Sequence, residues 1–173
     1  NKIDILINNA GIIHNSLLVN RLNKTYKMHS FKEWKKVFSA NLDTAFLTCI
    51  YAIPLMIKKK TNGLIINFSS ISAKGNIGQV AYSSSKSAIE TMSKTMAKEL
   101  AIFNIRSLTI APGFFNTPST KKNMTDDQLN RIISKTPSRR LGKLSELIQS
   151  IEFLINNKFV NSKTFRLDGG IEI

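Results

Sequence analysis

The fold is decided by residues 64–70, which read Leu64-Ile65-Ile66-Asn67-Phe68-Ser69-Ser70. A short run of apolar residues without polar alternation is typical of a strand buried on both faces, as in a parallel sheet. Small polar residues follow from Ser69 to Gly78 and predict a loop at the carboxyl end of that strand. The stretch therefore indicates an α/β domain in which helices cover both faces of a sheet.

Strand and helix patterns alternate on both sides of this run. Further strands are predicted at 3–7, 105–110 and 164–167. Helices are predicted at 31–59, with Pro54 bending the end, at 80–103, at 145–156, and in a short segment opened by Thr125 and Gln128 in capping-box spacing. Helices of ten or more residues between strands predict parallel β-α-β crossovers, so we expect one layered α/β domain over residues 1–173.

The composition is that of an ordinary globular domain. Of 173 residues, 42% are hydrophobic and 21% charged, which argues against a disordered tail, a collagen-like repeat or a disulfide scaffold. Cys49 is the single cysteine and only His14 and His29 accompany it, so we expect no metal site, and a reducing, cytoplasmic compartment is compatible. Apolar stretches are interrupted well short of the ~20 residues of a membrane span, so no membrane segment is predicted.

The net charge is unusual. The 25 basic and 11 acidic residues give +14, which favours acidic partners. The excess is mostly scattered lysine, with short clusters at 58–60, 121–122 and 139–140 and no nucleic-acid recognition module. We therefore expect no nucleic-acid partner and keep a basic nucleic-acid binder only as the least favoured alternative.

Tyr82 and Lys86 form a candidate acid–base pair. They are four residues apart at the start of a predicted helix, so they share one face and can meet at a common site. A phenol has a pKa near 10, and a neighbouring ammonium favours its ionised form, which brings proton exchange closer to neutral pH.

Other polar residues fall at the same predicted sheet edge. Ser69 and Ser70 end the central strand, where a hydroxyl can donate to a substrate oxygen. Asn41 lies within a predicted helix, where asparagine is a poor former, and the turn-forming residues 8–11 end the first strand. Each has a structural explanation as a cap, a turn or a core amide, but their joint order along the chain favours a site.

Taken together, these motifs resemble the short-chain dehydrogenase/reductase family, and within it most closely the 3-oxoacyl-acyl-carrier-protein reductases. The resemblance covers essentially the whole chain and rests on the ordered series Asn8-Asn9-Ala10-Gly11, Asn41, Ser69-Ser70, Tyr82-x-x-x-Lys86, Pro112-Gly113, Arg140-Leu141-Gly142 and Asp168-Gly169-Gly170. It implies a Rossmann-like, doubly wound parallel sheet in three α/β/α layers.

The resemblance also implies a role for each matching residue. The catalytic set would be Asn41, Ser70, Tyr82 and Lys86. Tyr82 would protonate the substrate carbonyl or act as base in the reverse direction, Lys86 would lower the pKa of Tyr82 and bind the nicotinamide ribose, and Asn41 would support a water-linked proton path. The cofactor, NAD or NADP, would be lined by Tyr82 and Lys86 with Asn9, Ala10, Gly11, Pro112, Gly113 and Thr117.

Some features depart from the family pattern. The Gly-rich pyrophosphate turn and the residue that reads the ribose 2′ position are not among the 173 residues, and family order places them before Asn1. We therefore expect the C-terminal portion of a single reductase domain, with doubtful activity in isolation. The segment 11–30 is longer than usual and carries Arg21, Lys24, Tyr26 and Lys27; a solvated insertion is favoured over a pocket-shaping loop.

The serine assignment stays open between two neighbours. The usual thirteen-residue interval before Tyr82 selects Ser69, whereas the register of the preceding strand selects Ser70 with one residue deleted from the loop. We favour Ser70, because strand register fixes side-chain direction while loops absorb deletions.

The sequence thus predicts an NAD(P)-dependent oxidoreductase acting on a ketone or secondary alcohol. The substrate would be a small molecule or an acyl-carrier-bound carbonyl, with a 3-oxoacyl thioester as one candidate, although Phe103 stands where such reductases often place an arginine. The family implies a homodimer or homotetramer. The main alternative is an inactive fragment or a binding subunit with the same fold, because fold alone does not establish function.

Overall fold

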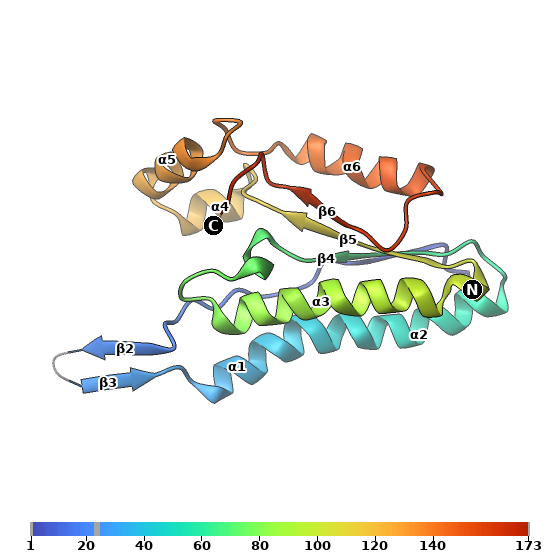
Figure 1. Cartoon of the computed structure of the whole chain (residues 1–173), viewed down its shortest axis with the longest axis horizontal. Helices are drawn as coiled ribbons and strands as arrows, with labels where there is room; N and C mark the ends of the chain where they lie inside the picture. Colours follow the sequence, from blue (N-terminus) through green and yellow to red (C-terminus); the bar gives the residue numbers. More distant parts are fainter. Residues whose placement is uncertain (1, 23–24, 173) are drawn as a thin grey trace.

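The computed structural model describes residues 2–22 and 25–172, so Lys24 of the long segment lies outside the described residues. Its main feature is a parallel sheet in the order β1-β4-β5-β6 (Figure 1). These strands are Ile5–Asn8, Leu64–Phe68, Arg106–Pro112 and Thr164–Leu167, so the four predicted strands are present. The α/β class with a parallel sheet is confirmed.

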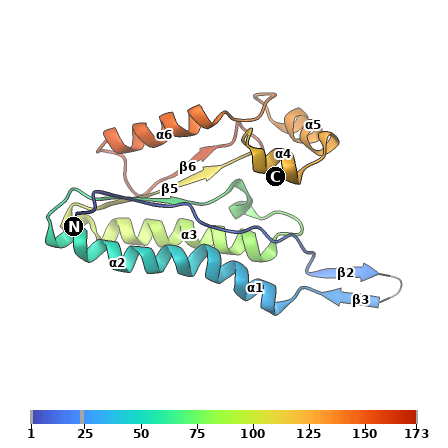
Figure 2. The same cartoon turned by 180° about the vertical axis from the view of Figure 1, so that it is seen from behind.

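Helices cover both faces of the sheet. Helices α2 (Thr44–Lys58) and α3 (Val80–Glu99) lie on one face, and α6 (Leu144–Asn156) lies on the other (Figures 1 and 2). All five residues of β4 are buried: Ile65 packs with the α2 and α3 side, while Leu64, Ile66 and Phe68 pack with the α6 side. Burial on two faces is the physical reason that the run lacks polar alternation.

The long predicted helix is one helical run in three parts. Helix α1 (Phe31–Phe38) is capped by Ser30, whose side chain accepts from the backbone N–H of Glu33, as the sequence predicts. A π-helical turn, η1 (Ser39–Asp43), then joins α1 to α2, and Pro54 lies inside α2. The π turn was not predicted from the sequence.

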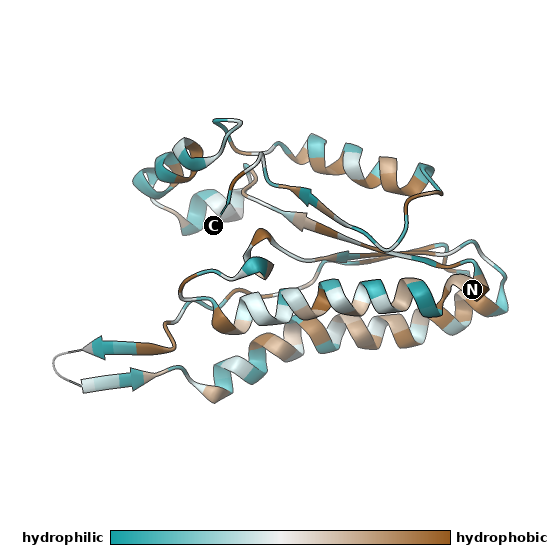
Figure 3. Cartoon of the chain, viewed as in Figure 1, coloured by the Kyte–Doolittle hydropathy of each residue, from teal (hydrophilic) through white to brown (hydrophobic). Residues whose placement is uncertain are grey.

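The same run corrects one sequence prediction. By length and composition alone, Phe31–Lys58 could cross a membrane, although the prediction from uninterrupted apolar stretches was that no segment could. Figure 3 shows α2 largely in the brown of apolar residues. Its inner side, with Ala45, Cys49 and Met56, is buried, and a core helix of a layered domain passes the same test of composition.

Three connecting segments differ from the sequence prediction. The segment after β1 forms an antiparallel hairpin of β2 (Val19–Leu22) and β3 (Thr25–Met28). Helix α3 ends at Glu99, a separate 3₁₀ turn, η3 (Ala101–Phe103), follows, and Asn104 in a left-handed conformation ends that turn. A short helix α4 (Pro118–Asn123) precedes α5 (Asp126–Lys135), which has the predicted Thr125–Gln128 capping box.

Arg106 joins the start of β5 to the end of α6. Its guanidinium donates to the carbonyls of Leu154, Asn157 and Val160 at 3.1, 3.1 and 2.9 Å. These carbonyls lie in and after the last turn of α6, where helical acceptors lack intrahelical donors and the helix dipole favours a cation. Arg106 therefore holds α6 against the sheet.

We expect Arg106→Ala to lower the free energy of unfolding by about 2–3 kcal/mol, the range of hydrogen bonds made by a charged donor. Arg106→Lys should give an intermediate loss, because lysine keeps the charge but not the planar fork of donors. Urea unfolding of the three proteins measures both values. Equal stability of the alanine variant and the wild type would show that Arg106 does not hold α6.

Candidate active site

The predicted acid–base pair lies on one face at the start of α3. Tyr82 and Lys86 are both buried, and the Lys86 Nζ lies 5.8 Å from the centre of the Tyr82 ring. The first turns of α3 reach the carboxyl end of β4, so the pair lies at the ligand-binding edge of the parallel sheet. The structure thus brings together the two residues that the i, i+4 spacing predicts to meet.

Lys86 is a buried ammonium tied to the sheet. Its Nζ donates to the carbonyl oxygen of Phe68, the last residue of β4, at 2.8 Å. Burial lowers the pKa of Lys86 to about 8, because removal from water penalises the charged form. Lys86 can therefore take up or release a proton close to neutral pH.

The pKa of Tyr82 moves in the direction opposite to the prediction. Burial of the phenol raises its pKa, and a hydrogen bond with the Ser70 side chain lowers it only in part. The net direction of the Tyr82 pKa therefore differs from the sequence prediction. The lowering by Lys86 that the family implies stays a prediction; the ammonium lies over the ring and donates to Phe68. Tyr82 is accordingly a neutral hydrogen-bond donor at pH 7.

The two neighbouring serines have different surroundings. Ser69 is buried, and its hydroxyl donates to the Lys86 carbonyl at 3.0 Å and to Glu90 Oε1 at 2.9 Å. Ser70 is only partly buried, caps the 3₁₀ turn η2 (Ile71–Lys74), and bonds with Tyr82. The geometry thus places Ser70 beside the phenol and uses Ser69 to fix α3, which supports the choice of Ser70; its catalytic role stays a prediction.

Asn41 fixes the loop that follows β1. Its side chain accepts from the Ile12 N–H at 2.7 Å and donates to the Ile12 carbonyl at 3.0 Å, and it also donates to Ser85 Oγ at 3.0 Å. Ser85 in turn donates to the carbonyl of Tyr82 at 2.8 Å. Asn41 lies in the π-helical turn, a feature often found at functional sites, and connects the first loop to the helix of Tyr82.

Gly11 is where the loop and Asn41 come closest. A Cβ added to Gly11 would lie 2.9 Å from Asn41 Oδ1 and 3.4 Å from Lys86 Nζ, so a side chain would not fit there without a shift. Asn9, Ala10 and Gly11 are exposed at the end of β1. Of the three predicted cofactor residues, Gly11 therefore borders the buried Lys86, and Asn9 and Ala10 precede it on the exposed edge.

The remaining predicted cofactor residues lie after β5. Pro112 ends the strand, and a Cβ on Gly113 would lie 2.7 Å from the Asp168 Cα, so glycine permits the close approach of the segment after β6. Thr117 caps α4, and its hydroxyl is hydrogen-bonded with Thr120 at 2.9 Å. In this structure Thr117 thus caps the local helix, and its place in the cofactor lining stays a prediction.

The closing motifs form a second structural unit at this edge. Arg140 makes two hydrogen bonds with the Glu146 carboxylate, at 2.8 and 2.6 Å, and Gly142 lies against the ring of Phe115. A cavity of about 360 Å³ opens there between the segments after β5 and β6. Its lining does not include Tyr82, so this cavity and the candidate acid–base pair are separate features.

Two residues of the site were not found from the sequence. Glu90 accepts a hydrogen bond from the Ser69 hydroxyl. Ser85 accepts one from Asn41 and donates one to the Tyr82 carbonyl. The available signal was spacing: Glu90 follows Lys86 by four residues and so shares its helix face. Ser85 is one of several small residues in the stretch 83–88, and no spacing distinguishes it from its neighbours.

Comparisons with known proteins agree with this geometry. A family model described as Enoyl-(Acyl carrier protein) reductase matches residues 1–172. The chain belongs to the short-chain dehydrogenase/reductase family. The Thermotoga maritima 3-oxoacyl-[acyl-carrier-protein] reductase FabG is 39% identical over 99% of the chain and 67% of its own length. Carbonyl reductase family member 4 of Xenopus laevis is 36% identical over 99% of the chain and 68% of its own length.

Solved structures of the family superpose closely. A 4-hydroxyisoleucine dehydrogenase complexed with NADH has a TM-score of 0.86 at 30% identity, covering 96% of this chain and 67% of that one. A putative gluconate dehydrogenase from Agrobacterium tumefaciens has a TM-score of 0.87 at 27% identity, covering 98% and 65%. The chain therefore spans about two thirds of the length of the proteins that it matches.

The buried Lys86 predicts a pH dependence of stability. Its folded pKa of about 8 lies below the ordinary value of 10.5, so from about pH 8 to 10.5 the unfolded chain binds more protons and the free energy of unfolding rises with pH. Relative to Lys86→Met, we expect the wild type to gain on the order of 2–3 kcal/mol over this range, at 1.36 kcal/mol per pKa unit. Urea unfolding of both proteins at pH 7.5 and 10 tests this; parallel pH profiles would contradict it.

The different surroundings of Ser69 and Ser70 predict separable effects. Ser69→Ala removes the buried hydroxyl that donates to the Lys86 carbonyl and Glu90, and should lower the free energy of unfolding by about 1–3 kcal/mol. Ser70→Ala removes the cap of η2 and should cost less, about 0.5–1 kcal/mol, while lowering turnover in the full-length protein. Unfolding and kinetics of both variants are measured together, and loss of turnover in Ser69→Ala alone would reverse the assignment.

Proposed function

We propose that the protein is an NAD(P)-dependent oxidoreductase that transfers a hydride between nicotinamide and a ketone or secondary alcohol. The observation that carries the proposal is the arrangement of three groups at the sheet edge. The Tyr82 phenol is hydrogen-bonded to Ser70, and the buried Lys86 ammonium lies over its ring. This geometry supports proton transfer between the Tyr82 phenol and a substrate oxygen held near Ser70.

The described residues fit the nicotinamide end of such a cofactor. An ammonium has three donors, whereas Phe68 is the one hydrogen-bond partner of the Lys86 Nζ among the described residues, so the buried group has donors left for a ribose hydroxyl. Gly11 lies beside this ammonium, and Asn9 and Ala10, which precede it, are exposed. Bound nicotinamide would supply or accept the hydride, while the protein orients it.

The side chains divide the remaining work among them. The Ser70 hydroxyl would hold the carbonyl oxygen, and the Tyr82 O–H would donate its proton to that oxygen during reduction. The phenolate left behind is stabilised by the Lys86 ammonium, which has a pKa near 8 and can also return the proton. In oxidation each proton moves in the opposite direction.

Asn41 acts on this set as a positioning residue. Its amide group is engaged by Ile12 and Ser85, so it fixes the loop and the helix between which a cofactor would lie. The water-linked proton path implied by the family is an additional role that we retain as a prediction.

The finer substrate assignment rests on similarity. The Thermotoga maritima relative is named a 3-oxoacyl-[acyl-carrier-protein] reductase, and we propose a 3-oxoacyl thioester as substrate on that ground. Either NAD or NADP is proposed, because the Gly-rich turn and the residue that reads the 2′ position do not occur in these residues. A cytoplasmic homodimer or homotetramer is proposed from the family.

One second candidate is a binding subunit that keeps the fold without turnover, because fold alone does not establish function. The two candidates differ in whether Tyr82 moves a proton.

Replacing the phenol tests this difference. In the full-length protein we expect Tyr82→Phe to lower kcat about 10²- to 10⁴-fold, the contribution of a positioned acid or base, with the cofactor Kd nearly unchanged. Nicotinamide absorbance measures turnover and fluorescence titration measures cofactor binding. Wild-type protein that binds cofactor but never turns over a carbonyl would favour the binding subunit.

A further inference from the structure

Three loops at the site edge of the sheet carry basic residues and no acidic residue. They follow β1 (9–30), β4 (69–79) and β5 (113–123), and none of the chain's 11 carboxylates falls in them. The loop after β6 differs, because it begins with Asp168. The described basic residues of the three loops are all exposed, and we call them the basic rim: Arg21, Lys27, Lys74, Lys121 and Lys122.

The hairpin β2–β3 carries two of these residues away from the body of the domain. At its base, the Ser16 N–H donates to the Gly78 carbonyl at 2.7 Å and Gln79 Nε2 donates to Asn15 Oδ1 at 2.8 Å. Both contacts lie just before α3, so the base of the hairpin is fixed relative to Tyr82. Beyond the base the two strands project from the body in both views (Figures 1 and 2).

The projecting hairpin also exposes large apolar side chains. Leu18, Tyr26 and Met28 are 60%, 69% and 61% exposed, and Ile77 in the neighbouring loop is 90% exposed. A two-stranded ribbon is only marginally stable in water when nothing covers it. Tyr, Met and Arg on one ribbon match the residue types that protein interfaces favour.

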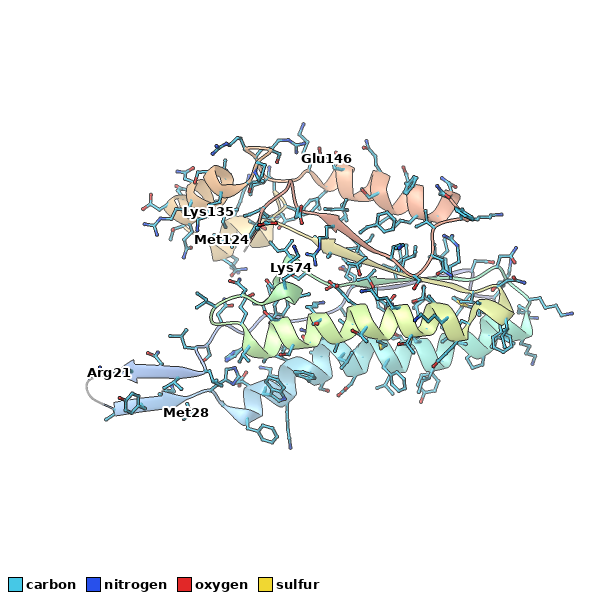
Figure 4. All side chains as sticks on the ribbon, viewed as in Figure 1. Arg21, Met28, Lys74, Met124, Lys135 and Glu146 are labelled. Atoms are coloured by element: carbon cyan, nitrogen blue, oxygen red, sulfur yellow. The ribbon has the colours of Figure 1, made fainter. Side chains whose placement is uncertain are left out.

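The distribution of charge selects the kind of partner. In Figure 4, Arg21 and Met28 lie on the hairpin, whereas Lys74 lies on the turn after β4, closer to the sheet. A small anion would contact only one part of the basic rim, but a protein surface spans several. At the basic rim itself a second copy of this chain is disfavoured, because the five positive charges there would face a partner of net charge +14.

Resting on the proposed function, we propose that the β2–β3 hairpin and the basic rim are the docking surface for an acidic protein that carries the substrate carbonyl to Tyr82. Opposite charges on the two proteins steer their encounter, and the apolar side chains of the hairpin are covered in the complex. The surface acts on the carrier and not on the reacting atoms, so it changes the KM of a carried substrate and leaves the chemistry alone.

The test compares two charge reversals of equal size in the full-length protein. Arg21→Glu with Lys27→Glu alters the hairpin, and Lys158→Glu with Lys163→Glu is the control, because both control lysines are exposed and lie outside the three loops. Each protein is assayed with one acyl group on an acidic acyl carrier protein and with the same group on a short uncharged thiol. Arg21→Gln with Lys27→Gln is a second hairpin variant that introduces no new charge.

We expect the hairpin reversal to raise the KM for the carrier-bound substrate about 10-fold or more, the neutral hairpin variant to raise it less, and the control to change it less than about twofold. The kcat/KM for the uncharged thioester should stay within about twofold in all variants, and the wild-type advantage of the carrier should shrink as salt is raised. Equal losses in hairpin and control variants, or equal losses on both substrates, would overturn the docking surface.

A failure of the proposed function can be distinguished from a failure of the docking surface. If the wild type reduces neither substrate, the reaction assignment fails, and calorimetric titration with the carrier protein alone still decides the docking surface. Salt-sensitive binding that is lost in the hairpin reversal supports it, and no binding overturns it. Binding to phosphatidylglycerol vesicles without binding to the carrier would overturn it by assigning the surface to a membrane.

Discussion

The hydrogen bond from the Lys86 ammonium to the Phe68 carbonyl is the contact around which the site is built. It ties the start of α3 to the end of β4 at 2.8 Å, and Ser69 secures the same junction through the Lys86 carbonyl and Glu90. Because the helix is fixed at this point, Tyr82 one turn earlier is held beside Ser70. Strand, helix and phenol therefore have one common anchor.

The same contact lowers the stability of the fold but keeps a group that can take part in proton transfer. A buried amine is held near the pH at which it loses its charge, since little water reaches it. An apolar side chain there would avoid the desolvation of an ammonium but could neither stabilise a phenolate nor bind a ribose hydroxyl. Local instability of this kind is common where residues are arranged for proton transfer. The buried Asn41, by contrast, has partners for both ends of its amide.

The sequence predicted those parts of the structure that leave a local pattern. The uniform apolar run of β4, the caps at Ser30 and Thr125, and the strand Thr164–Leu167 are each encoded in a few neighbouring residues. The hairpin was missed because its pairing depends on contacts across the turn, and the direction of the Tyr82 pKa was missed because burial is set by distant elements. The choice between Ser69 and Ser70 depends on the register of β4. The sequence indicates that register, but only the structure shows it.

The π-helical turn at residues 39–43 constrains how this chain can change in length. Such a turn holds one residue more than an α-helical turn, so deleting one residue there would restore regular winding with α1 and α2 still in phase. Cys49 and Met56 of α2 would keep their places in the core, whereas a deletion between them would rotate the residues that follow by about 100° and take Met56 out of it. A gap of a single codon at the π turn would therefore spare the core and instead displace Asn41 from Ile12 and Ser85.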